Sequence, residues 1–216
     1  MMSLGEYRYI AVEGPIGVGK TTLARALARE LGARLILEEP VDNSLLASYY
    51  SDIRKYAFQT QIYFLASRYK QIQHLRQDSL FENPLVVADY IFEKDLIFAQ
   101  CFLSNDELAI YHNLYTTLSY NVIKPGFVIL LQAETDIIMD RIAMRGNKYE
   151  LRIDRDYMEE LIDGYDTFFF NYVDAPLLIV NTNEVDYRTN DIDVKDIVRQ
   201  IEKHDSGTQY YVPMKK

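Results

Sequence analysis

The sequence predicts an α/β fold, in which a parallel sheet of five strands is flanked by helices on both faces. Short apolar runs alternate with longer segments of helical periodicity along most of the chain. A glycine-rich loop joins the first apolar run to the first helical segment. With 216 residues, 49% of them hydrophobic and 25% charged, the chain can build one domain with a sizeable core. We therefore expect a single domain over residues 1–216, with its core over 7–203.

Five runs rich in branched and aromatic apolar residues are expected to be the strands. They cover residues 7–12, 35–37, 85–88, 127–131 and 177–180. Long helical patterns, and not hairpin turns, separate these runs. The strands should therefore form a mostly parallel sheet with helices on both faces.

Helical periodicity predicts six helical segments between and after the strands. They cover residues 20–31, 55–78, 92–122, 134–145, 155–172 and 191–203. In the third segment, Ser104 followed by Glu107 matches a capping box, so a new helix should begin within residues 104–107. The tail from 204 to 216 lacks periodicity, and we expect it to be peripheral or partly disordered.

The loop after the first strand carries the most informative pattern, G-x-x-x-x-G-K-[ST]. It consists of Gly14, Pro15, Ile16, Gly17, Val18, Gly19, Lys20 and Thr21, with Thr22 next. Glycines let such a loop turn tightly, so that its N–H groups converge on phosphate oxygens at the N-terminus of the following helix. Lys20 would reach the β- and γ-phosphates, and the Thr21 hydroxyl would contact Mg²⁺. A turn without a ligand is the alternative, and the flanking strand and helix argue against it.

Acidic residues follow two of the predicted strands, where ligands bind in a sheet of this kind. Glu39, after the second strand and before Pro40, is a candidate base for transfer of a phosphoryl group to an alcohol. Asp89, at the end of the third strand, has the place of an acid that helps to hold Mg²⁺. The alternatives are a solvated acidic turn for Glu39 and a helix cap for Asp89.

A basic stretch within the otherwise acidic chain predicts a mobile lid over about 141–155. Arg141 and Arg145 are four residues apart, so they share one helix face, and Gly146 provides a hinge beyond them. Such arginines could close over the transferring phosphoryl group. The alternative is an exposed basic face that is paired with nearby acids. Those acids are Glu134, Asp136 and Asp140.

Charge and cysteine content limit the partners of the chain. A formal charge of −9 disfavours general affinity for nucleic acid or anionic membranes, so we expect small-molecule ligands. Cys101 is the single cysteine and lies in an apolar helical run, which favours a buried role and a reducing cytoplasm. The first residues show no apolar stretch of signal-peptide length, and no later run approaches a membrane span.

Five motifs, in order, resemble the bacterial deoxynucleoside kinases, and the likeness runs from about residue 9 to about residue 203. They are the loop 14–21, Glu39-Pro40-Val41, the helix 58–68, Ala88-Asp89-Tyr90, and the segment 141–146. Residues 87–90 and 96–99 most resemble the deoxyguanosine kinase branch. The resemblance implies a kinase of nucleotide salvage that uses ATP and Mg²⁺ to phosphorylate the 5′-hydroxyl of a deoxynucleoside. Deoxyguanosine is the leading acceptor, and deoxyadenosine and deoxycytidine stand behind it.

The resemblance also implies roles for individual residues. Glu39 would take the 5′-hydroxyl proton, and Gln61 would pair with the nucleobase edge. Tyr50 and Glu150 would hold the sugar 3′-hydroxyl. Arg68 and Asp95 would lie beside the base, where an arginine suits the O6 and N7 acceptors of guanine, although Asp95 could instead neutralise Arg68. A homodimer through the long helices is implied as well, and the apolar region 92–122 is compatible with it.

The chain departs from the family pattern at two places. Many relatives carry an arginine after the third-strand acid, whereas Tyr90 and Ile91 stand here, so that Lys94 or a lid arginine could substitute. Many relatives also carry a tryptophan five residues beyond the catalytic glutamate, whereas this chain has Ser44 and no tryptophan. That wall of the nucleoside pocket must be built differently.

Two other functions fit the phosphate loop. A nucleoside monophosphate kinase of the thymidylate type would need a further cationic site for the acceptor phosphate, and none is identifiable. A nucleotide-switched regulator resembling a GTPase would need D-x-x-G and N-K-x-D motifs. The segment from Asn147 to Glu150 begins like the second motif, but it ends in a glutamate and lies in the predicted lid.

Overall fold

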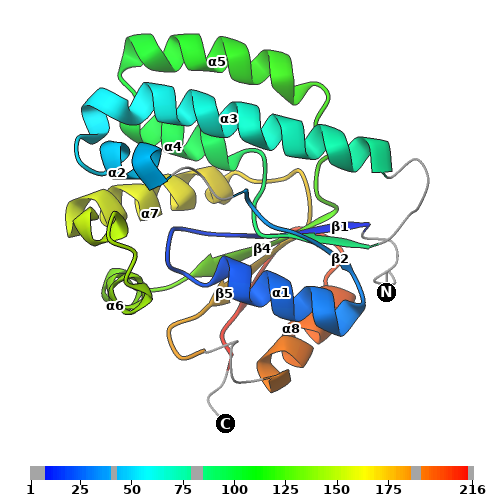
Figure 1. Cartoon of the computed structure of the whole chain (residues 1–216). Helices are drawn as coiled ribbons and strands as arrows, with labels where there is room; N and C mark the ends of the chain where they lie inside the picture. The colour runs from blue at the N-terminus through cyan, green and yellow to red at the C-terminus, as the bar shows by residue number, and fades with distance from the viewer. Residues whose placement is uncertain (1–7, 40–42, 79–84, 186–190, 214–216) are drawn as a thin grey trace.

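The computed structural model describes residues 8–39, 43–78, 85–185 and 191–213. Its centre is a six-stranded sheet in which every neighbouring pair of strands runs parallel, in the order β2-β3-β1-β4-β5-β6 (Figure 1). The strands are β1 Tyr9–Glu13, β2 Arg34–Ile36, β3 Val86–Ala88, β4 Phe127–Gln132, β5 Leu177–Asn181 and β6 Thr208–Tyr211. The predicted α/β class and the five predicted strands, which are β1 to β5, are confirmed.

Every predicted helical segment is helical in the structure. The helices are α1 Lys20–Leu31, α3 Ile53–Asp78, α4 Lys94–Phe102, α5 Asn105–Ser119, α6 Thr135–Arg145, α7 Arg155–Phe170 and α8 Asp191–Lys203. The predicted break between α4 and α5 is confirmed, because Ser104 and Glu107 form the two reciprocal bonds of a capping box. Two elements were not predicted, namely α2 Asn43–Tyr49 and the short 3₁₀ helix η2 Glu150–Arg152.

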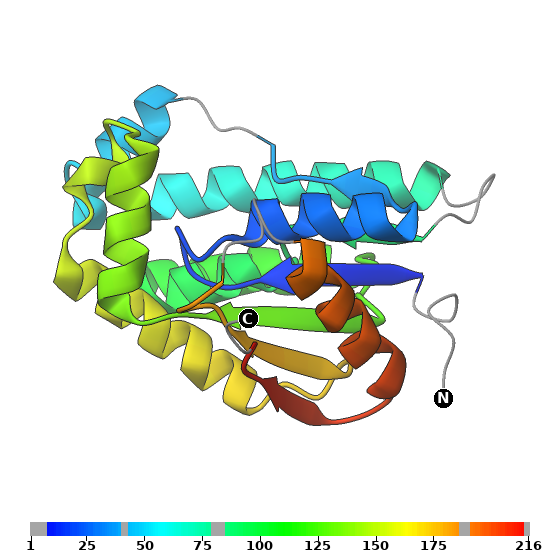
Figure 2. The same ribbon diagram turned by 90° about the horizontal axis from the view of Figure 1, so that it is seen from below.

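Helices cover both faces of the sheet. α1 and α8 pack on one face, while α3, α4 and α7 cover the other and α5 lies outermost over α3 and α4 (Figures 1 and 2). The central strands β1 and β4 are almost wholly buried. This burial agrees with their nearly continuous apolar sequences, because the strands of a parallel sheet are covered on both faces. In the part of the chain that the structure describes, no helix combines the length and apolarity that a membrane crossing needs.

The prediction of a five-stranded sheet and a peripheral tail is wrong in one respect. Beyond Gly207, β6 pairs in parallel with β5 from Leu177 opposite Thr208 to Val180 opposite Tyr211. Only alternate residues of β6 are partly covered, as expected for an edge strand with one face against the protein. The sequence of this strand is too polar to stand out as an apolar run. The terminal Lys215 and Lys216 lie outside the described residues.

Candidate active site

The loop 14–19 leaves the end of β1 and leads into α1. Gly14 adopts a φ of +144°, and a Cβ atom there would lie 2.5 Å from the backbone oxygen of Leu131 on β4. A side chain at this position would therefore collide with the neighbouring strand. The glycine lets the chain turn beside β4 and present its amides at the start of α1.

Lys20, the first residue of α1, folds its side chain back over this loop. Its Nζ donates hydrogen bonds to the carbonyl oxygens of Gly14 at 2.7 Å and Pro15 at 3.0 Å. Burial lowers the pKa of Lys20 to about 8, and the nearby positive charge of Lys94 acts in the same direction. The amine is thus placed where phosphate oxygens would replace backbone carbonyls as its partners.

Thr21 and Asp89 converge from α1 and the end of β3. The Thr21 hydroxyl donates to Asp89 Oδ2 at 2.5 Å, and Asp89 Oδ1 accepts a hydrogen bond from the backbone N–H of Glu38 at 2.7 Å. Hard oxygen ligands at the mouth of a phosphate loop fit Mg²⁺. Among the described residues no group of three His, Cys, Asp or Glu side chains could hold a metal ion by itself. Nucleotide phosphates would have to complete the coordination of Mg²⁺.

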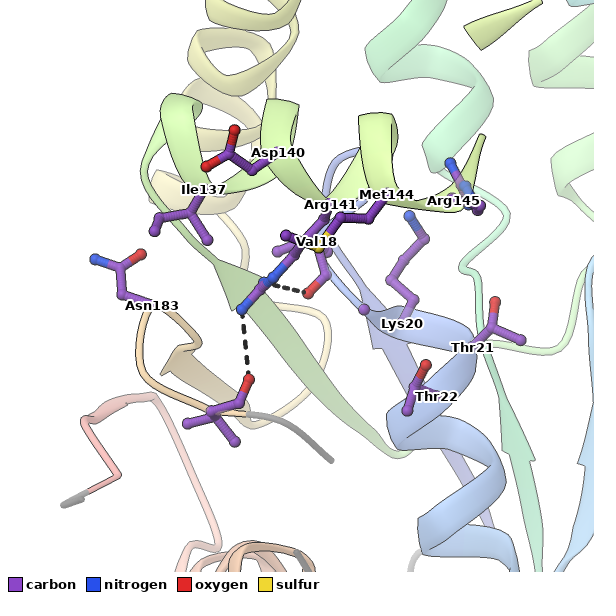
Figure 3. Close-up of a pocket in the computed structure, with 13 residues that line it drawn as sticks. Val18, Lys20, Thr21, Thr22, Ile137, Asp140, Arg141, Met144, Arg145 and Asn183 are labelled. Carbon is purple, nitrogen blue, oxygen red and sulfur yellow. Dashed lines mark hydrogen bonds between the residues drawn. The ribbon is translucent and has the colours of Figure 1, made fainter. Parts of the chain in front are cut away.

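A cavity of about 520 Å³ separates the phosphate loop from the predicted lid helix α6. Its lining comes from residues 17–22, from α6 and from the segment after β5 (Figure 3). At one side of the cavity, the loop and α6 pack closely at Gly17, where a Cβ atom would lie 2.7 Å from Ile142 Cγ1. The cavity is large enough for the phosphates and part of the nucleoside of a triphosphate.

The two predicted lid arginines have different surroundings. The Arg141 guanidinium donates to the carbonyl oxygens of Val18, Thr182 and Val185, so it ties α6 to the phosphate loop and to the segment after β5. Figure 3 shows the bond to Val18 as a dashed line. Arg145 is half-exposed and pairs with Glu150 at 2.8 Å. The catalytic roles of both arginines remain predictions, and Arg145 has the greater freedom to turn towards a phosphate.

Tyr50 lies against the lid, as its predicted role beside Glu150 requires. Its ring stacks on that of Tyr149, with centroids 6.4 Å apart and an angle of 6° between the planes. Burial raises the pKa of Tyr50 above its usual range, and the charge of Glu150 adds to this effect. Glu150 is itself buried and also accepts a hydrogen bond from Asn147.

The adjacent acids Glu38 and Glu39 point to different partners. Glu39 is exposed, and its Oε2 accepts a long hydrogen bond of 3.3 Å from Ser67. Glu38 pairs through Oε1 with Arg68 and through Oε2 with Lys94 at 2.7 Å. Burial alone would raise the pKa of Glu38, but the two cations outweigh it and hold the pKa well below the usual range. Pro40 and Val41 of the predicted motif lie outside the described residues.

Gln61, Arg68 and Asp95 are buried together on the inner side of α3 and α4, with relative exposures of 2%, 3% and 0%. Arg68 binds Asp95 and Glu38 through its two terminal nitrogens and lies 5.0 Å from the ring centroid of Phe64. In the described part of the chain, Arg68 Nε and Asp95 Oδ2 are buried without a hydrogen-bond partner. Unpaired buried polar atoms are costly, so a free donor and a free acceptor here indicate a place for a polar ligand.

The two positions at which the chain departs from the family pattern, Tyr90 and Ser44, have different surroundings. Tyr90 is fully buried next to Arg68, with the guanidinium 6.0 Å from its ring centroid. Its position therefore contributes to the wall around Arg68 and supplies no cation. Ser44 is exposed on α2, and Lys94 is buried beside Glu38.

Glu13 is the residue of this site that the sequence did not reveal. It ends β1, is fully buried, and accepts hydrogen bonds from the Gly14 N–H at 2.8 Å, the Ile91 N–H at 2.9 Å and the Tyr165 hydroxyl at 3.0 Å. It thereby fixes the start of the phosphate loop to the segment after β3. An acid at the end of an apolar strand next to a glycine was the one available signal.

A phosphate loop with the hydrogen-bonded pair Thr21 and Asp89 on one side and a buried polar pocket on the other is typical of P-loop kinases that act on small molecules. A family model described as deoxynucleoside kinase matches residues 10–205. The chain belongs to the deoxynucleoside kinase family. This membership argues against the two alternative interpretations of the loop, a GTPase-like regulator and a thymidylate-type kinase.

Individual relatives agree with this assignment. The chain is 34% identical to deoxyguanosine kinase of Bacillus subtilis, over 90% of this chain and 96% of that protein. It is 31% identical to deoxyadenosine/deoxycytidine kinase of Bacillus subtilis, over 89% and 90% of the two chains. The solved structure of deoxyadenosine kinase from M. mycoides with bound dCTP superposes with a TM-score of 0.76 at 27% identity, over 90% of this chain and 99% of that one.

Proposed function

We propose that the protein transfers the γ-phosphoryl group of ATP, with Mg²⁺, to the 5′-hydroxyl of a deoxynucleoside, and that deoxyguanosine is the preferred acceptor. One observation carries the proposal. Hydrogen bonds run without interruption from Thr21 through Asp89 and Glu38 to Arg68. The phosphate-binding side and the buried polar pocket are therefore two halves of one site, as transfer between two bound substrates requires.

The buried pocket supports guanine as the base. The free Arg68 Nε donor suits the O6 acceptor of guanine, and the free Asp95 Oδ2 acceptor suits its neighbouring N1–H donor. Gln61 carries both a donor and an acceptor for a further contact. The likeness to a deoxyguanosine kinase supports the same choice, and the likeness to a deoxyadenosine/deoxycytidine kinase keeps those two nucleosides as the alternative.

Glu39 is the better base of the two adjacent acids. Both carboxylate oxygens of Glu38 are paired with cations, so this group is a poor proton acceptor. Glu39 has one long hydrogen bond and is accessible to an incoming hydroxyl. We propose that Glu39 abstracts the proton of the 5′-hydroxyl and that Tyr50 and Glu150 hold the sugar.

The assembly of the protein and its location are also proposed. Ile110 and Leu114 lie one turn apart on α5 and are 55% and 44% exposed. Apolar residues on the outermost helix suit a homodimer through the long helices. The lone Cys101 has no partner for an intrachain disulfide, which suits a reducing cytoplasm.

A single panel of acceptors tests the proposed function. Transfer from ATP is measured to deoxyguanosine, deoxyadenosine, deoxycytidine and thymidine, and to their 5′-monophosphates. We expect the highest kcat/KM with deoxyguanosine and no transfer to a monophosphate. A preference for deoxyadenosine or deoxycytidine would overturn the choice of base, and transfer to none of the nucleosides would overturn the function.

A further inference from the structure

Lys94 is a buried cation with donors to spare. It is the first residue of α4, and its relative exposure is 6%. Within the described part of the chain, the hydrogen-bond acceptor of its Nζ is Glu38 Oε2, at 2.7 Å. An ammonium group has further N–H donors, and a buried donor without a partner is costly. The surroundings of Lys94 therefore suit an additional, negatively charged partner.

Lys94 is linked to the start of α1, beyond the phosphate loop, through Glu38 and Asp89. Its partner Glu38 donates a backbone hydrogen bond to Asp89, which in turn contacts Thr21. Lys94 and Lys20 are close enough that the charge of Lys94 helps to lower the pKa of Lys20. Two ammonium groups that repel each other in the protein alone gain most when an anion binds between them.

Glu38 holds this cation in place. Its second oxygen is fixed by Arg68, which Asp95 also binds, so the carboxylate cannot turn away from Lys94 without breaking a buried ion pair. Glu38 is thus bound on one side by the pocket that suits a nucleobase and on the other by Lys94. We expect the position of the Lys94 amine to depend on Glu38 and to depend little on the exposed Glu39.

We propose that Lys94 is a second cation of the phosphoryl-transfer site, that it contacts the phosphoryl group on the acceptor side, and that Glu38 is its positioning residue. In the transfer, the bond from the γ-phosphorus to the β–γ bridging oxygen breaks, a bond from that phosphorus to the nucleoside 5′-oxygen forms, and Glu39 accepts the hydroxyl proton. Lys94 stabilises the negative charge on the moving group. The inference rests on the proposed function.

The test compares the wild-type chain with Lys94→Gln, Lys94→Arg and the matched control Lys124→Gln. Lys124 pairs with Asp174 on the surface. It precedes the start of β4, whereas the phosphate loop follows the end of the parallel strand β1. We expect Lys94→Gln to lower kcat by about 10²-fold with the best acceptor while both KM values change less than about threefold. Lys94→Arg keeps the charge and should recover at least about tenfold of that loss.

Binding of ligands gives a readout that does not depend on turnover. By calorimetry, Lys94→Gln should weaken binding of the 5′-monophosphate of the best acceptor by about tenfold and leave binding of the nucleoside itself unchanged. Glu38→Gln should also lower kcat, and the double variant Glu38→Gln/Lys94→Gln should have nearly the kcat of Lys94→Gln alone.

The outcomes separate the two proposals. If the wild type phosphorylates a nucleoside and Lys94→Gln matches Lys124→Gln in kcat and in monophosphate binding, the role of Lys94 is wrong and the proposed function stands. A loss in Lys94→Gln that Lys94→Arg does not recover, with a lowered melting temperature and equal weakening of nucleoside and monophosphate binding, would show a structural role. If the wild type phosphorylates no nucleoside, the proposed function fails and the role of Lys94 with it.

Discussion

Binding of a nucleoside triphosphate should be accompanied by uptake of a proton by Lys20 at mildly alkaline pH. In the free protein, burial and the charge of Lys94 lower the pKa of Lys20 to about 8. Phosphate oxygens beside the amine favour its charged form and should raise the pKa again. The bound state therefore holds more protons than the free state at pH values above about 7.

The size of the effect follows from the pKa of the free protein. At pH 8 half of the Lys20 amines are neutral, so saturation should take up about 0.5 proton per chain, with about 0.1 at pH 7 and about 0.9 at pH 9. Because the proton is taken up on binding, affinity must fall as the pH rises through this window. By linkage, the slope approaches about tenfold per pH unit near pH 9.

Calorimetry measures this quantity directly. A non-hydrolysable ATP analogue is titrated at a fixed pH in two buffers that differ in ionisation enthalpy, and the difference in heat gives the number of protons exchanged. The matched control is Lys20→Arg, since a guanidinium stays charged throughout this range. Uptake below about 0.1 proton at both pH 8 and pH 9 in the wild type, or equal uptake in Lys20→Arg, would refute the reasoning.

Three further substitutions follow from the site. Glu39→Gln should lower kcat by about 10² to 10⁴-fold and leave nucleotide affinity and the melting temperature unchanged, because Glu39 is exposed; turnover near that of the wild type would rule Glu39 out as the base. Gly17→Ala should weaken nucleotide binding and lower the free energy of unfolding by about 1 to 3 kcal/mol in urea titrations, since the new Cβ meets Ile142. An unchanged denaturation midpoint would contradict the close packing. Glu13→Gln should lower the free energy of unfolding in urea titrations by about 1 to 3 kcal/mol, because an amide N–H would face a buried donor. A variant as stable as the wild type would show that the three bonds to Glu13 are dispensable.

The sequence predicted those elements that carry their own apolar pattern. The strands β1 and β4 are runs of buried apolar residues, and α1 ends at Gly32 with a φ of +59°, as a helix-stopping glycine should. Two of the three elements that were not predicted, α2 and β6, have their causes elsewhere in the chain. The seven residues of α2 pack against α3, and β6 is held by pairing with β5. Neither partner is visible from the short segment itself.

The same division applies to the candidate site. The phosphate loop is a contiguous pattern, so spacing alone indicated Lys20 and Thr21. The links that join its parts are not contiguous. Thr21 and Asp89 are 68 residues apart, and Glu38 and Lys94 are 56 residues apart. A contiguous sequence motif indicates which side chains are candidates for binding a ligand. The ion pairs that orient these side chains join distant residues and depend on how the helices pack.

Two adjacent glutamates show what this packing adds. By sequence, Glu38 and Glu39 are adjacent acids after the same strand, and the position of Glu39 before Pro40 and the resemblance to a family were the grounds for choosing Glu39. In the structure, two cations hold Glu38 in its charged form, whereas Glu39 keeps lone pairs for a proton. A site that transfers a phosphoryl group needs both properties, since one carboxylate must stay charged to orient the cations and another must be able to accept a proton. If this division is correct, the kcat lost in Glu38→Gln should depend on Lys94, while the kcat lost in Glu39→Gln should be the same with or without Lys94.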